Sequence, residues 1–274
     1  LKIMLMMITI YTITGSAVYA AEIPVSDQDQ LITSSDWTEI SNLQDEMKKE
    51  EPDATIDYDK ALKVYVDCNL IKLQTADTKK LTSALESANY VWVIPFKMEK
   101  TYGMFTVAKG LPLSEEAKSV LTKAEQEEVK NHAGKWMITE TAEHTVEPYY
   151  DILLEKREAL SDCTRVVLVG SQPGMRQPVA LGMDDETARI WISLGYQYPV
   201  MEKIPETQNV ESGVYSFDSV AEISDTYIED SEVSTGAGVQ SRSSMKYVAG
   251  IGIIVIGSIL ILSVLKKKKL EDYE

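Results

Sequence analysis

The chain has 274 residues, and its 27 basic residues against 43 acidic ones give a formal net charge of −16. A chain this acidic repels phosphate backbones, which argues against nucleic acid as a partner. Only two cysteines occur, Cys68 and Cys163, and there is no Asn-x-Ser/Thr sequon, which argues against a eukaryotic ectodomain and favours a bacterial protein.

Residues 1–20 have the pattern of a secretory signal peptide. Lys2 precedes an apolar stretch from Ile3 to Ile13, and Val18 and Ala20 occupy the −3 and −1 positions of a cleavage site. The apolar stretch is too short to span a bilayer comfortably, so we expect cleavage after Ala20. The alternative is an uncleaved anchor, with both chain ends on the cytoplasmic side.

The sequence predicts one α+β domain with a mainly antiparallel sheet and several helices over residues 36–205, after a flexible polar segment at 21–35. Asp36, with Glu39 three residues on, predicts a capping box and a helix that ends before Pro52.

Apolar residues then alternate between Leu62 and Leu70, which predicts a strand within residues 60–73. This pattern places Cys68 in the core. We favour a free thiol there, with a disulfide to Cys163 as the alternative.

The rest of the domain alternates between helical and strand patterns. Further helices are expected at residues 78–88, from Ser114, from Thr122 with Glu125 completing a capping box and Gly134 closing the helix, and from Pro148. Further strands are expected at residues 89–96, 101–108, 136–140, 165–170, 178–183 and 188–194. Short turns between most of these strands favour antiparallel pairing.

Beyond Pro205 the sequence becomes acidic and poor in apolar residues, which predicts a disordered stalk over residues 206–246. Tyr247–Leu265 then contains no charged side chain. As a helix this run would span roughly 28 Å, close to the ~30 Å hydrocarbon core of a bilayer.

The membrane, contacted through Tyr247–Leu265, is thus the first predicted partner. The orientation of the chain across it follows from the lysines that flank this run. Lys266–Lys269 come directly after the apolar run, and cytoplasmic flanks carry the excess of lysine and arginine. We therefore expect residues 21–246 outside the membrane and residues 266–274 as a short cytoplasmic tail. That tail is too short to hold a catalytic domain.

Residues 232–236, Glu-Val-Ser-Thr-Gly, precede this segment. A Thr-Gly pair, an apolar helix and terminal lysines together resemble the layout of Gram-positive cell-wall sorting signals. Glu232 and Val233 depart from it, because Leu and Pro are expected there. Wall attachment through Thr235 is therefore an alternative to a retained anchor.

No residue constellation amounts to a readable catalytic, cofactor or metal site. His144 and Glu147 lack the His-Glu-x-x-His spacing of zinc proteases, and His132 has no partner pattern. Cys163 with either histidine could form a thiol dyad, but no nucleophile turn surrounds it. Ser171 follows Gly170 directly, so a hairpin turn explains residues 170–174 better than a nucleophile elbow.

Aromatic and acidic residues have a structural interpretation as the default. Core packing is expected for the aromatic side chains in strand patterns, with a stacking groove for glycan or peptide as the alternative: Tyr90, Trp92, Trp136 and Trp191. Tyr149 and Tyr150 are expected on a helix face. Solvated surface charge is expected for the acidic clusters, which lack calcium-loop spacing: Asp57, Asp59 and Asp67, and Asp184, Asp185 and Glu186.

These observations predict a single-pass bacterial surface protein with an extracytoplasmic binding or accessory domain. Its partner would be another envelope protein or a wall component. The alternatives are a cell-envelope hydrolase with an unrecognised site and a wall-anchored structural module.

Overall fold

The computed structural model describes residues 23–224, apart from 145, 146, 171, 173, 174, 176 and 197. The predicted signal peptide, the apolar run Tyr247–Leu265 and the tail therefore lie outside the described residues. Within the described part of the chain, no helix is long and apolar enough to cross a membrane.

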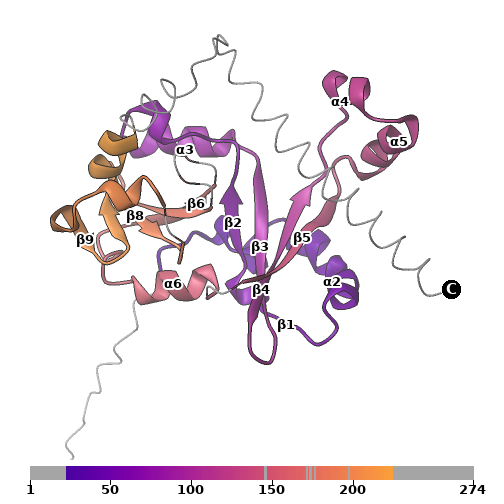
Figure 1. Ribbon diagram of the computed structural model, residues 1–274, viewed down its shortest axis with the longest axis horizontal. Coiled ribbons are helices and arrows are strands. Elements are labelled where there is room, and N and C mark those ends of the chain that lie inside the picture. The colour runs from indigo at the N-terminus through magenta and orange to yellow at the C-terminus, as the bar shows by residue number, and fades with distance from the viewer. Residues whose placement is uncertain are drawn as a thin grey trace, which may run out of the picture.

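The fold is α+β, with one ten-stranded, mostly antiparallel sheet in the described residues (Figure 1). The strand order is β5-β4-β3-β2-β6-β7-β8-β10-β9, and β1 pairs with β3 beside this path. Among these ten described strands, β2 and β6 are the one parallel pair. The strands are β1 Thr55–Ile56, β2 Leu62–Tyr65, β3 Tyr90–Lys97, β4 Tyr102–Lys109, β5 Trp136–His144, β6 Arg165–Val169, β7 Val179–Met183, β8 Ala188–Ser193, β9 Asn209–Glu211 and β10 Val214–Ser216.

Six α-helices are fully bounded by described residues, and residues 217–224 are helical as well. The helices are α1 Trp37–Ile40, α2 Gln44–Glu50, α3 Thr78–Glu86, α4 Glu115–Val120, α5 Lys123–His132 and α6 Tyr149–Glu155. The short 3-10 turns include η1 Asp27–Asp29, η2 Leu31–Thr33 and η4 Tyr58–Lys60.

Apolar side chains fill both faces of the sheet. On one face, α3 packs Leu81 and Leu85 against β6 and β7, while α1 and α2 pack Ile40 and Met47 against β3 and β4. On the other face, α6 packs Leu153 against β2, β6 and β8. In Figure 1, α3 and α6 accordingly lie on opposite sides of the sheet.

Several predicted helix signals are confirmed. The Ser114 side chain accepts a hydrogen bond from the Ala117 N–H at the start of α4. The capping box of Thr122 and Glu125 is formed at the start of α5. Gly134, with φ +75°, follows the end of that helix. α4 and α5 project together beyond the sheet, as an arm between β4 and β5 (Figure 1).

The predicted capping box at Asp36 is wrong. The Asp36 side chain makes no cap hydrogen bond; its Oδ2 instead accepts from the Tyr90 hydroxyl at 2.9 Å and from Trp92 Nε1 at 3.0 Å. The carboxylate therefore holds the start of α1 against β3. The helical segment is also not continuous, because a 3-10 turn, Ser41–Leu43, separates α1 from α2.

The predicted strand at residues 60–73 is also too long, because β2 ends at Tyr65. Buried Gln172 explains the change: its Nε2 donates to the Cys68 carbonyl at 2.6 Å, and its Oε1 accepts from the Leu70 N–H at 2.9 Å. The Gln172 side chain thus satisfies backbone groups of the loop after β2 that would otherwise need a neighbouring strand as partner. Cys68 is buried, as the alternation predicted.

The predicted limits of the domain are wrong at both ends. Ile23 and Val25 are buried, and Val25 bridges to Val166 of β6, so the N-terminal segment is part of the fold. After Pro205, β10 pairs with β8, and Val214 and the side chains of 217 and 220 are buried. The sequence did not predict β9 and β10 because each has only three residues, too few to show an alternating pattern. The predicted stalk can therefore begin only after residue 224.

The two cysteines are free thiols and pack on opposite faces of the sheet. Cys68 lies in the cluster covered by α3, and Cys163 lies in the cluster covered by α6. A disulfide between them would have to pass through the sheet. The free-thiol prediction is therefore confirmed for this fold.

Candidate functional site

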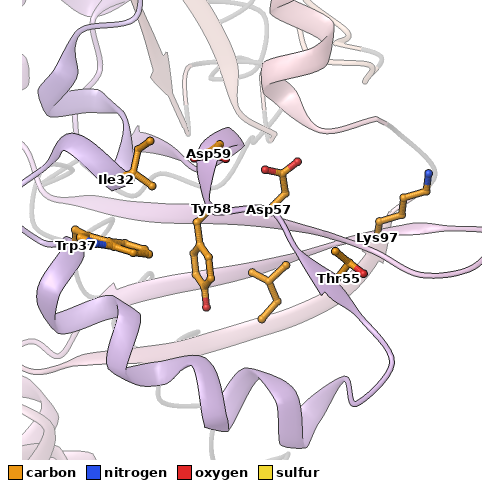
Figure 2. Close-up of a pocket in the computed structure, with 8 residues that line it drawn as sticks. Ile32, Trp37, Thr55, Asp57, Tyr58, Asp59 and Lys97 are labelled. Carbon is orange, nitrogen blue, oxygen red and sulfur yellow. The ribbon is translucent and has the colours of Figure 1, made fainter.

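A broad surface hollow of about 530 Å³ lies along β1 and η4 (Figure 2). Residues 55–59 form one side. Ile32 in η2 and Trp37 at the start of α1 form the other. The lining residues are Ile32, Trp37, Thr55, Ile56, Asp57, Tyr58, Asp59 and Lys97.

An aromatic pair forms one end of this hollow. The Trp37 and Tyr58 rings meet edge to face, with centroids 5.2 Å apart, and both side chains are only half-buried. The Tyr58 hydroxyl points inward, 3.7 Å from the Met47 sulfur, so the ring is held between α1 and α2. Burial raises the pKa of this hydroxyl above its ordinary value. The pair offers a fixed apolar surface to a ligand.

Charged groups complete the lining. Asp57 and Asp59 lie beside the aromatic pair, and Lys97 lies at the opposite end of the hollow (Figure 2). Lys60 is 3.7 Å from Asp57, but it lies closer to Asp151, at 2.8 Å. The hydrogen bond to Asp151 raises the pKa of Lys60. Asp59 makes no ion pair with any described residue. Of the two lining carboxylates, Asp59 is therefore the one open to a further cationic group, because Asp57 already lies near Lys60.

A buried ionic network supports the wall that carries Ile32 and Trp37. Asp29 is only 2% exposed, and it accepts hydrogen bonds from Arg165 Nη2 at 2.9 Å, the Tyr65 hydroxyl at 2.8 Å and Ser26 Oγ at 2.6 Å. These bonds attach η1 to β2 and β6. Since η2 and α1 follow directly, the network fixes the wall in place.

Lys63 extends this network under the aromatic side chains. Its Nζ lies 3.8 Å from Asp29, 4.5 Å from the Tyr90 ring centroid and 5.2 Å from the Trp92 centroid. Burial lowers the pKa of Lys63, and the nearby Asp29 carboxylate partly opposes this shift. Lys63 is occupied by these internal contacts, so we assign it a structural role.

The three tryptophans singled out from strand patterns are core residues, as predicted by default, whereas Tyr90 is half-buried and packs at the edge of the core. Trp92 and Trp191 have no exposed surface, and Trp136 is 7% exposed. Tyr149 is buried, and its hydroxyl lies 3.3 Å from that of Tyr196. None of these side chains lines the hollow.

The structure does not bring the candidate catalytic residues together. Cys163 packs against Gly182 and Leu160, and burial raises the pKa of its thiol to about 11. His132 ends α5, where its Nδ1 lies 2.9 Å from the Glu128 carbonyl oxygen. His144 ends β5, opposite Tyr102. Within the described ranges, no three His, Cys, Asp or Glu side chains gather as metal ligands.

The acidic clusters have separate roles. Asp67 accepts from the backbone N–H of Asn89 at 2.6 Å and so closes a loop. Asp184 accepts from the N–H groups of Glu186 and Thr187, and these bonds lower the pKa of its carboxyl. Both are structural, whereas Asp57 and Asp59 line the hollow. The prediction of plain surface charge was therefore incomplete for these two residues.

Trp37 and Tyr58 were missed as site residues because neither lies in a strand pattern. A signal was nevertheless present, because each aromatic residue stands among polar ones, in Ser-Asp-Trp-Thr-Glu and Asp-Tyr-Asp. An aromatic side chain with polar neighbours on both sides is a candidate for partial exposure.

Comparisons of the chain with family models, curated proteins and solved structures found no match.

Proposed function

We propose that this chain is a membrane-anchored bacterial surface protein whose extracytoplasmic domain binds a ligand or partner in the hollow at Trp37 and Tyr58. The signal-peptide pattern of residues 1–20, the apolar run Tyr247–Leu265 and the four lysines after it support the location. The partner is an envelope protein or a wall component.

The single observation that carries the binding role is the partly exposed Trp37–Tyr58 pair beside two carboxylates. The other three tryptophans of this chain, Trp92, Trp136 and Trp191, are buried, whereas Trp37 keeps part of its ring at the surface. Exposed aromatic surface in a hollow with a few polar groups is typical of a binding site.

Photo-crosslinking in intact cells tests this proposal. A photoreactive amino acid replaces Thr55, an exposed lining residue, and in a control it replaces Glu127 on the exposed arm. Thr55 should yield a discrete adduct that Glu127 does not yield, and mass spectrometry should identify an envelope protein or a wall fragment. Identical adducts from both positions, no adduct from Thr55, or a cytoplasmic partner would contradict the proposal.

Two alternatives give different results with the full chain. A cell-envelope hydrolase would digest purified wall material and lose this activity in Asp59→Asn, because Asp59 is the lining carboxylate without an ion-pair partner among the described residues. A wall-anchored module would yield a wall peptide linked to the carbonyl of Thr235 in place of Gly236, with residues 236–274 removed.

A further inference from the structure

β1 has a free edge. The Asp57 N–H donates to the Pro95 carbonyl at 2.9 Å, and Ile56 is the direct partner of Phe96. Because hydrogen-bonded and non-hydrogen-bonded pairs alternate in an antiparallel ladder, the N–H and C=O of Ile56 point away from β3. In the described part of the chain, no other strand pairs with β1.

This edge borders the hollow. The residues of β1 and the two that follow, 55–58, all line it, so a ligand seated there would lie along unpaired backbone groups. An exposed strand edge is a template for an added strand. Two residues are too few to bind a strand by backbone pairing alone, so side-chain recognition must supply the rest.

The side chains that line the hollow indicate which residues a peptide bound there would carry. At the aromatic end of the hollow, Asp59 has no ion-pair partner among the described residues and can attract a cation, with Asp57, which also lies 3.7 Å from Lys60, close by in the chain. The Trp37 and Tyr58 rings there accept an alkyl stem or a guanidinium plane, whereas Lys97 lies at the opposite end of the hollow. The net charge of −16 favours the approach of a basic partner over a long range. A neutral glycan would leave the strand edge and the Asp59 carboxylate without matched groups.

We propose that the hollow binds an extended peptide segment of a partner protein, with a lysine or arginine placed between the carboxylates and the aromatic pair and its backbone added alongside β1. This inference rests on the proposed function and specifies the ligand class. The Ile56 N–H and C=O pair with the peptide backbone, and the Asp57 and Asp59 carboxylates bind the basic side chain.

The test uses the full chain in detergent micelles at physiological salt and a random hexapeptide library. The retained peptides should be enriched in lysine or arginine. The affinity of a retained peptide should fall about tenfold in the Asp57→Asn, Asp59→Asn double variant, because a charge-assisted contact is lost. The matched control is Glu127→Gln with Glu128→Gln, which removes the same charge from the arm and should change affinity less than about twofold.

Backbone methylation of the peptide tests strand addition separately from charge. Methylating the peptide nitrogens that face β1 should weaken binding about tenfold, and methylating the alternate nitrogens should have little effect. Equal tolerance of both patterns, no preference for basic residues, or an equal loss in the arm control would overturn the inference. If the peptide tests fail but the photoreactive residue at position 55 still crosslinks an envelope partner in cells, only the assigned ligand class is wrong. If that crosslink is also absent, the proposed function itself is wrong.

Discussion

Arg165 Nη2 donates to Asp29 Oδ2 at 2.9 Å, and this buried ion pair joins two residues that are 136 positions apart. It attaches the N-terminal segment to β6, in the middle of the sheet. The same segment continues into η2 and α1, which supply Ile32 and Trp37 to the hollow. The candidate site therefore depends on a structural contact that no ligand touches.

Replacing Asp29 with alanine should strongly destabilise the fold. The change leaves Arg165 and Lys63 buried without their counter-charge, and loss of one partner of a buried pair costs about 3–5 kcal/mol. Urea unfolding of the full chain in micelles, followed by tryptophan fluorescence, measures this loss. Asp27→Ala is the matched control, since Asp27 is exposed in the same turn and should change stability by less than about 0.5 kcal/mol.

Lys63→Met provides a second comparison. Asp29 keeps Arg165, Tyr65 and Ser26 as partners in this variant, so the loss should be clearly smaller than for Asp29→Ala. An equal loss in the two variants would mean that Lys63, and not Arg165, is the main counter-charge of Asp29.

Both cysteines should be unreactive in the folded chain. Burial raises the pKa of Cys68 to about 12 and that of Cys163 to about 11, so almost no thiolate exists at neutral pH. A chromogenic disulfide reagent should find no rapidly reacting thiol in native protein and two after denaturation without reductant. Recovery of fewer than two thiols under those conditions would reveal a disulfide and contradict the packing on opposite faces.

Stability should fall at alkaline pH. Burial raises the pKa of both thiols and of several tyrosines, Tyr65, Tyr90, Tyr149 and Tyr198. The unfolded chain loses these protons from about pH 9 upward while the folded chain keeps them, so proton release favours unfolding. The urea midpoint should therefore decrease between about pH 9 and pH 11. A midpoint that rises over this interval would contradict the assigned burial.

Gly103→Ala should destabilise the β3–β4 hairpin. A Cβ atom at Gly103 would overlap the Phe96 ring, which is held in the core against Phe105. Overpacking of this kind costs about 1–3 kcal/mol. The double variant with Phe96→Leu should recover part of the loss, because the smaller side chain leaves room for the methyl group. Additive losses in the double variant would show that the steric account is wrong.

Local sequence signals predicted most elements of the fold. Capping residues such as Ser114 and Thr122, and the apolar faces of Leu81 and Leu85, act within one helix and are visible in the sequence. Asp36 shows the limit of such reasoning. The pattern of a cap was present, but two donors from β3 compete for the carboxylate, and those donors are 54 and 56 residues away.

The hollow could not be predicted for the same reason. Trp37 and Tyr58 meet because Asp29 and Asp36 fix the N-terminal segment to the sheet, and both attachments are long-range. The segment itself is polar and was predicted to be flexible. Its burial depends on Ile23, Val25 and Leu31, which are too widely spaced to show a period.

The central claim is that the hollow faces the outside of the cell and is occupied there, and thiol labelling of a Thr55→Cys variant tests it most directly. The natural cysteines are buried, so the new thiol is the reactive one. A membrane-impermeant maleimide should label it in intact cells, yet more slowly than in the purified chain, whereas Glu127→Cys should react at the same rate in both. Labelling of Thr55→Cys only after the cells are permeabilised, or an equal rate with and without the cellular partners, would contradict the claim.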